Sequence, residues 1–161
     1  MKIATISEIK RALKNYNEED LRLLCLRLVK HKKESKELLH YLLFEASDEQ
    51  SFILAVQEEI EEGFEEMNKA NLYWAKKSIR KILRNINKYI RFSGQKETEV
   101  ALRLFYCRQI LKSGLAIQRS AALFNLYKRQ VTLIEKAIGQ LHPDLQFDYE
   151  GDLTEVSTIV K

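Results

Sequence analysis

The stretch that decides the fold is residues 45–96, EASDEQSFILAVQEEIEEGFEEMNKANLYWAKKSIRKILRNINKYIRFSGQK. Residues 45–66 have nine acidic side chains and no Lys or Arg, and residues 69–96 have nine basic side chains and no Asp or Glu. In both parts apolar residues recur every three or four positions, as is typical of amphipathic helices. The stretch therefore predicts two neighbouring helices with outer faces of opposite charge, an acidic one to about Asn68 and a basic one over residues 72–92.

Each of these two helices has an apolar stripe that we expect to lie in the core. In the acidic helix the stripe is Phe52, Val56, Ile60, Phe64 and Met67. In the basic helix it is Leu72, Ala75, Ile79, Ile82, Leu83, Ile86 and Ile90, and Gly94 is the expected C-terminal residue. The charged residues fall on the opposite side of each helix at 100° per residue.

The rest of the chain repeats the helical pattern. One Pro and five Gly in 161 residues leave few helix breakers, and 45% apolar with 31% charged residues is typical of a globular protein. Helix starts are predicted at Thr5 with Glu8, Asn17 with Asp20, Ser35, and Ser47 with Gln50. Further helices are predicted over about 96–112 and 117–141. We expect an all-α fold of about seven helices packed as antiparallel hairpins, either a multi-helix bundle or a short helical-hairpin stack.

The domain organisation follows from where this pattern stops. We expect one domain over residues 1–142, with Pro143 ending regular structure. Residues 143–161 hold five acids and one base, Lys161, and form an acidic tail that is either loosely docked or disordered. Whether the tail folds back onto the basic helix stays open. The 117–141 helix has a wide apolar arc that includes Leu126 and Leu133, so it is either central or shares a strip with another subunit.

Cysteine usage and hydropathy indicate the compartment. Cys25 and Cys107 lie in apolar-periodic segments without CxxC spacing, and we expect two buried free thiols in a reducing environment. No stretch has the apolar core of a signal peptide or the length of a membrane span. The prediction is a soluble cytoplasmic protein that does not bind membranes.

Motifs for catalysis or cofactor binding are sparse. Glu37 and His40 form one Glu-x-x-His pair, and Glu58, Glu62 and Glu66 step along one helix face, but neither set resembles a complete metal site. The sequence has no GxSxG elbow and no phosphate-binding glycine loop. We therefore expect no enzyme, no cofactor, no metal and no small-molecule substrate.

The basic helix is the strongest candidate binding surface. Its outer face holds six cations within about 100° of one another, Lys77, Arg80, Lys81, Arg84, Lys88 and Arg91. Tyr73 lies inside this arc, with Trp74 and Phe92 at its edge. Cations interleaved with aromatic rings suit single-stranded RNA or DNA, because phosphates bind Lys and Arg while bases stack on rings.

Two other interpretations of the charged faces stay open. In the first, the basic face is a solvated surface whose flank pairs with the acidic helix, for example Glu59 and Glu66 with Lys76. In the second, the acidic face Glu58, Glu62, Glu65 and Glu66 of one copy meets the basic face of another in a salt-sensitive dimer.

Three stretches together resemble a known group of proteins. These are IKRALKNYNEEDLRLLCLRLVKHKKESKELLHYLL, VALRLFYCRQIL and LFNLYKRQVTLIEKAI. In order and in leucine, tyrosine and lysine placement they resemble a family of small all-helical bacterial proteins catalogued only as a domain of unknown function. The resemblance implies an all-helical fold and a bacterial origin, and it assigns no activity and no functional residue.

The predicted function follows from these surfaces. We expect a non-catalytic interaction module or adaptor that binds a protein partner, or itself, through its charged outer faces. The alternative is nucleic-acid binding by the basic helix, residues 72–92.

Overall fold

The computed structural model describes residues 2–160 and confirms the all-α fold. Within that range it has nine α-helices, one π-helical turn, one 3-10 turn and no strand, so helices outnumber the seven expected. The chain divides into two compact units, Met1–Phe44 (unit 1) and Glu45–Lys161 (unit 2). This division lies far from the boundary expected at residue 142.

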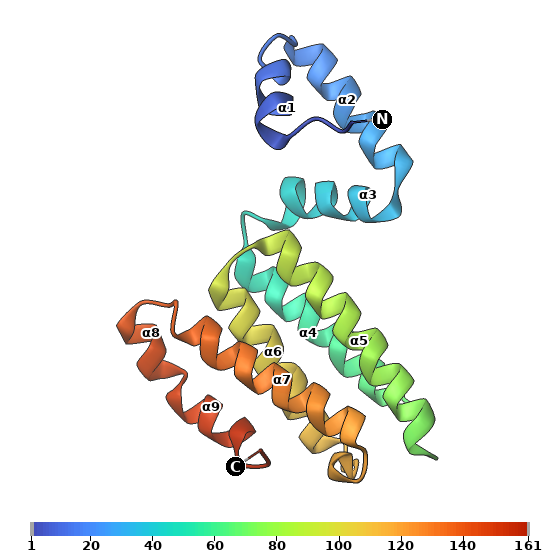
Figure 1. Cartoon of the computed structure of the whole chain (residues 1–161), viewed down its shortest axis with the longest axis vertical. Helices are drawn as coiled ribbons and strands as arrows, with labels where there is room; N and C mark the ends of the chain where they lie inside the picture. Colours follow the sequence, from blue (N-terminus) through green and yellow to red (C-terminus); the bar gives the residue numbers. More distant parts are fainter. Residues whose placement is uncertain (1, 161) are drawn as a thin grey trace. The chain divides into compact units, whose positions relative to one another are not determined.

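Unit 1 contains three short helices, α1 (Ile6–Leu13), α2 (Glu18–His31) and α3 (Lys33–His40) (Figure 1). The predicted capping box at Thr5 is confirmed, since the Glu8 N–H donates to Thr5 Oγ1 at 3.3 Å and the Thr5 N–H donates to Glu8 Oε2 at 2.7 Å. Asn17 caps α2 as predicted. Ser35 does not cap α3, which begins at Lys33 because Lys32 is already extended. None of the residues of these three helices is buried.

Unit 2 follows the π-helical turn Tyr41–Glu45 and contains the core. Its helices are α4 (Glu49–Glu65), α5 (Leu72–Ser93), α6 (Lys96–Lys112), α7 (Ala121–Ile138), α8 (Pro143–Asp148) and α9 (Glu150–Ser157), with a 3-10 turn at Ile117–Arg119 before α7. Asp48, one residue after the expected Ser47, caps α4 by accepting a hydrogen bond from the Ser51 N–H at 3.1 Å. Gly94 ends α5 with a φ of 68°, a conformation that glycine adopts without strain.

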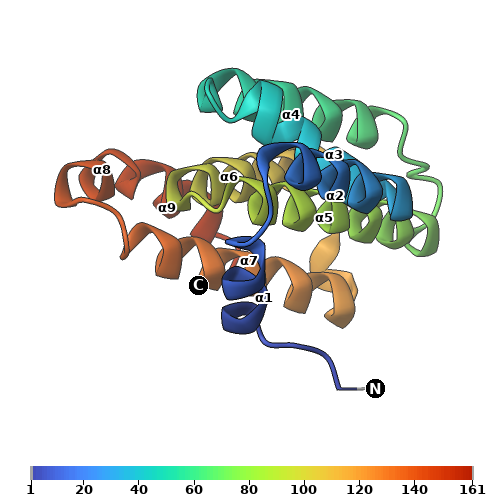
Figure 2. The ribbon, with the colours of Figure 1, turned by 90° about the horizontal axis from the view of Figure 1, so that it is seen from above.

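The centre of unit 2 is α6, which packs against α4, α5, α7 and α9 (Figures 1 and 2). Its buried residues surround the helix: Thr98, Val100, Leu102, Arg103, Leu104, Tyr106, Cys107, Gln109 and Ile110. The apolar stripe predicted for α4 is buried throughout, and that of α5 is buried at Ala75, Ile79, Ile82 and Ile86. α7 (Ala121–Ile138) is shorter than the helix predicted over 117–141, and it packs against α6 and α9.

The acidic tail forms α8 and α9 and belongs to unit 2. Pro143 begins α8 instead of ending regular structure, because proline has no N–H to lose at the first helical position. α9 packs against α6 and α7, where Val156 and Ser157 are buried. The burial of these side chains ties the tail to the core of unit 2.

Candidate interaction surfaces

The basic face of α5 is exposed along most of its length. Lys77, Arg80, Lys81, Arg84 and Arg91 are exposed, and Lys88 is half-buried. Two of the cations lie over neighbouring rings, since Lys77 Nζ is 5.5 Å from the centre of the Trp74 ring and Lys88 Nζ is 4.7 Å from that of Tyr89. The sequence-predicted cations therefore share one side of α5, which we call the basic face.

The aromatic side chains at the start of α5 are also open to solvent. Tyr73 is 64% exposed and Trp74 is 45% exposed. Their rings meet edge to face with centroids 5.2 Å apart. Phe92, expected at the edge of the arc, is buried and offers no ring to a ligand. The stacking candidates thus lie together at the N-terminal end of the basic face.

The acidic face lies on α4, which is the neighbour of α5. Its four predicted members, Glu58, Glu62, Glu65 and Glu66, are all exposed. Among residues 2–160 none of these carboxylates forms an ion pair, and Lys76, Lys77, Arg80, Lys81 and Arg84 form none either. The two faces lie on adjacent helices without neutralising each other.

The expected pairing of Lys76 with Glu59 and Glu66 does not form. Glu59 instead accepts hydrogen bonds from Asn85 Nδ2 at 3.0 Å and from the Tyr89 hydroxyl at 2.6 Å. These neutral donors hold α4 to α5, and Lys76 takes no part in the contact. Glu61 of α4 lies 3.4 Å from Lys112 Nζ of α6, so the acidic helix forms an ion pair with α6 at this point.

A groove of about 340 Å³ runs between the two faces. Its α4 wall includes Glu59, Glu62 and Glu66, and its α5 wall includes Ser78, Lys81 and Asn85. The helices approach closely at Gly63, where a Cβ atom would lie only 3.0 Å from Cγ1 of Ile82. Glycine at this position therefore permits the close approach of the two helices along the groove.

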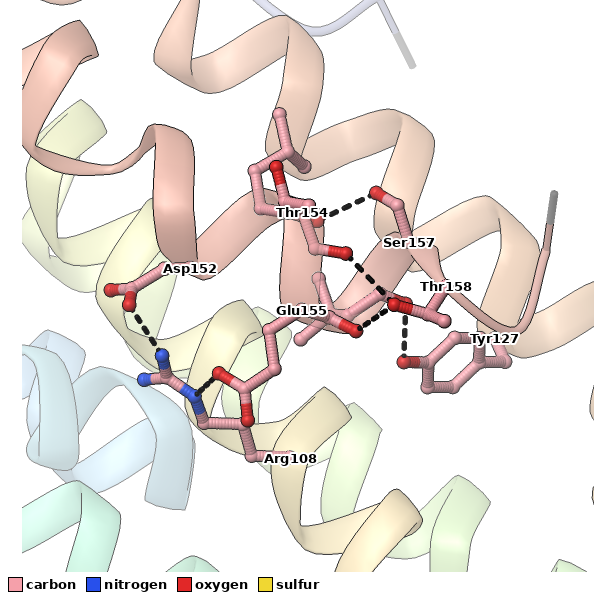
Figure 3. A network of polar contacts seen from close by, with 9 residues as sticks. Arg108, Tyr127, Asp152, Thr154, Glu155, Ser157 and Thr158 are labelled. Atoms are coloured by element: carbon pink, nitrogen blue, oxygen red, sulfur yellow. Dashed lines mark hydrogen bonds and ion pairs between the residues drawn. The ribbon is translucent and has the colours of Figure 1, made fainter.

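The tail acids bind α6 and leave the basic face of α5 uncovered. Arg108 donates to Asp152 at 2.6 Å and to Glu155 at 2.9 Å (Figure 3). The Tyr127 hydroxyl of α7 donates to the Val156 carbonyl oxygen at 2.7 Å. The two carboxylates raise the pKa of Arg108 despite the opposing effect of its partial burial. Two of the five tail acids are thus paired with a cation that the sequence analysis did not single out.

A buried polar network joins three helices of unit 2. Arg103 of α6 donates to Glu99 at 3.0 Å, to Asn87 of α5 at 3.1 Å and to Gln130 of α7 at 2.7 Å. Burial alone would raise the pKa of Glu99, but hydrogen bonds from Lys96 and Arg103 lower it overall. No pattern around Arg103 distinguishes it in the sequence, because a lone Arg between apolar residues is equally common on a solvated face.

The two cysteines differ in their burial. Cys107 is buried as expected, and this burial raises the pKa of its thiol to about 12, with Arg103 opposing the shift. Cys25 is exposed, contrary to expectation, because unit 1 has no core to cover the apolar side of α2.

The described residues contain neither a cluster that could hold a metal ion nor a helix that could span a membrane. Within residues 2–160 no three His, Cys, Asp or Glu side chains lie close enough together to hold a metal ion, and this includes Glu37 and His40. Among the same residues, every helix is too short or too polar to cross a lipid bilayer.

Comparison with known proteins adds no assigned role to these surfaces. The chain matches no protein-family model, no curated protein and no solved structure.

Proposed function

We propose that the chain is a non-catalytic interaction module that binds a protein partner through the charged faces of α4 and α5. The observation that supports this most directly is the lack of ion pairs between the two faces within the described residues. Charges that are not neutralised within the fold remain available to a complementary surface and increase its rate of encounter. We further propose that the helices of unit 2 pack as antiparallel hairpins.

The arrangement suits a partner with charges of both signs. The groove between the faces has carboxylates on one wall and Lys81 on the other, with apolar Ile60 and Ile82 between them. A partner seated there would meet an acidic and a basic row within one footprint. Because such rows reject a partner whose charges are reversed, they provide specificity more than affinity.

Charge reversal of each face tests this proposal. The chain, Arg80→Glu/Arg84→Glu and Glu62→Lys/Glu66→Lys would each be used to capture partners from a cell lysate. Lys128→Glu/Arg129→Glu on exposed positions of α7 is the matched control, since it changes the charge as much as the first variant does. We expect proteins recovered by the chain and by the control to be lost from one or both face variants, and recovery to fall as salt rises. Identical recovery by all four proteins would contradict the proposal.

A second candidate function is binding of single-stranded nucleic acid by the basic face. The observation that favours it is the exposure of Tyr73 and Trp74 beside Lys77. Stacking of a base on an aromatic ring contributes about 1–3 kcal/mol, and the neighbouring cations would contact phosphates.

Fluorescence anisotropy of labelled single-stranded and duplex oligonucleotides distinguishes this candidate. Nucleic-acid binding predicts that Tyr73→Ala/Trp74→Ala weakens binding to single strands, and that Arg80→Glu/Arg84→Glu abolishes binding to both. The α7 control should bind like the unmodified chain. No binding at low or physiological salt would eliminate this candidate and leave the protein-binding proposal standing.

A further inference from the structure

Unit 1 is a small unit with an uncovered apolar surface. Its helices bury none of their residues, and its large exposed apolar side chains are Ile3, Ile6, Ile9, Leu13, Tyr16, Leu23, Leu26, Leu28, Leu38, Leu42, Leu43 and Phe44. Units of about 40 residues usually need disulfides, metals or association with another surface to be stable. Cys25 is free, so no disulfide of this unit supplies that support.

The longest helix of unit 1 has an exposed seam with coiled-coil spacing. Glu19, Leu23, Leu26 and Lys30 follow one another at intervals of four, three and four residues, which places them on one face of α2. Leu23 is 56% exposed and Leu26 is 52% exposed. This seam lies on a different side of α2 from the half-buried Leu21 and Leu24.

The seam has the same pattern in both directions apart from the sign of its charges. Its midpoint falls between Leu24 and Cys25, with a leucine at equal distance on either side and a charged residue beyond each leucine. The charge is acidic at the N-terminal end, Glu19, and basic at the C-terminal end, Lys30. A two-fold axis at the midpoint would therefore bring Leu23 against Leu26 of a second copy, and Glu19 against Lys30 of that copy.

We propose that the chain forms a homodimer in which the α2 helices of two copies pack antiparallel through this seam. The flanks of the seam support the same orientation, because Asp20 on one copy would lie near Arg27 on the other. Neither Asp20, Arg27 nor Lys30 has an ion-pair partner within the described residues. Glu19 lies 3.3 Å from Arg22 in an exposed pair, which is weak enough to leave the carboxylate available.

The same residues disfavour a parallel arrangement of the two α2 helices. Parallel helices in register would place Glu19 against Glu19 and Lys30 against Lys30, and would bring Arg22 near Arg27. Each of these contacts joins like charges, which repel. The charge order along α2 thus favours a second copy of this chain, in one orientation, over an arbitrary apolar partner. The dimer uses no residue of α4 or α5, so it is independent of the proposed function.

A charge-swap experiment on the full chain tests the dimer. Sedimentation velocity over about 1–200 μM would be recorded for the chain, Glu19→Lys, Lys30→Glu, and the double variant Glu19→Lys/Lys30→Glu. Each single variant places like charges opposite one another at both ends of the seam, so its dimer dissociation constant should rise about tenfold or more. The double variant restores opposite charges and should dimerise like the unmodified chain.

Mixing the two single variants gives the sharpest readout. Glu19→Lys has two lysines and Lys30→Glu has two glutamates at the seam ends, so an equimolar mixture should form heterodimers although each variant alone dimerises weakly. Both substitutions also oppose the α2 macrodipole, but that effect persists in the double variant and in the mixture. If association is restored in the double variant and in the mixture, its loss in the single variants is due to charge pairing and not to a destabilised helix. Circular dichroism of each sample measures whether helix content is retained.

Glu18→Lys is the matched control, because it makes the same change one residue earlier and off the seam. It should dimerise like the unmodified chain. A chain that stays monomeric at every concentration would overturn the proposal and indicate that unit 1 is covered by another partner. Single variants that dimerise normally, or a mixture that stays monomeric, would overturn it equally.

Discussion

Cys107 lies among the buried side chains of α6, whereas Cys25 is exposed on α2. The thiolate is the reactive form of cysteine, and burial raises the pKa of Cys107 to about 12. At pH 7 we expect a maleimide to label one thiol per folded chain rapidly, and the second only in denaturant. Mass spectrometry after timed quenching checks this. Rapid labelling of Cys25→Ser in the folded state would contradict it.

Among the charged side chains of unit 2, removal of Arg103 should lower the free energy of unfolding most. Arg103→Ala would remove a buried donor from Gln130, which is buried, and from Glu99 and Asn87, which are half-buried. We expect the free energy of unfolding to fall by about 3 kcal/mol, as is typical when one member of a buried pair is removed. Arg108→Ala is the control, since its partly exposed ion pairs contribute up to about 1 kcal/mol. Urea denaturation of both variants measures the difference, and equal losses would contradict this ranking.

Glu99 should make unfolding depend on pH in the acid range. Its pKa in the folded protein lies below the ordinary value of 4.5, because Lys96 and Arg103 outweigh the opposing effect of burial. The stabilisation is therefore complete above about pH 4.5 and is lost as pH falls through the lowered value. We expect Glu99→Gln to flatten the decline of unfolding free energy below pH 4.5, measured by urea denaturation at several pH values. Glu97→Gln, an exposed change in the same helical turn, should keep the decline.

At the scale of elements, α9 is held to the rest of unit 2 by a buried apolar side chain and a buried hydrogen bond, in addition to its two ion pairs with Arg108. Val156 is fully buried, and the Tyr127 hydroxyl donates to its carbonyl oxygen. We expect Val156→Ala to cost about 2 kcal/mol and Tyr127→Phe about 1 kcal/mol. Amide exchange of α9 should accelerate in both variants.

Thr154→Ala is the control for α9, since its exposed hydroxyl bonds only within its own helix. It should change amide exchange little. Unchanged exchange in Val156→Ala would contradict the docking of α9 and return the tail to the loosely held state that its composition suggested.

Element boundaries were predictable where a single side chain determines them. The Thr5 and Asn17 caps and the end of α5 at Gly94 are local features and match the structure. The start of α4 shifted by one residue because Ser47 and Asp48 are both good caps, and only the path of the chain selects between them. The helix predicted over about 96–112 is present as α6, but its own sequence does not show that four helices pack around it and enclose it on all sides.

At the scale of the whole molecule, the two units differ in their ability to fold alone. Unit 2 contains nearly all the buried residues of the described chain, and unit 1 has none within its helices. We expect a fragment of residues 45–161 to keep cooperative, helical unfolding, and a fragment of residues 1–44 to be largely unfolded at low concentration. Circular dichroism with thermal melting measures both.

The longer fragment should also stay monomeric, because it lacks α2. Loss of cooperative unfolding in residues 45–161 would show that unit 2 depends on unit 1. A fragment that dimerises as the full chain does would place the self-association surface outside α2.

The sequence by itself determined the helices before residue 142, and the apolar stripes and opposite charges of α4 and α5, because these depend on residue type and on a period of 3.6 residues. Only the tertiary structure decided which charges are paired. It joined Asp152 and Glu155 of the tail to Arg108, gave Glu59 neutral donors, and left Lys76, Lys77, Arg80, Lys81 and Arg84 of α5 without ion pairs among residues 2–160. Pairing depends on distances of a few ångströms between residues far apart in the chain, and periodicity along one helix does not specify them.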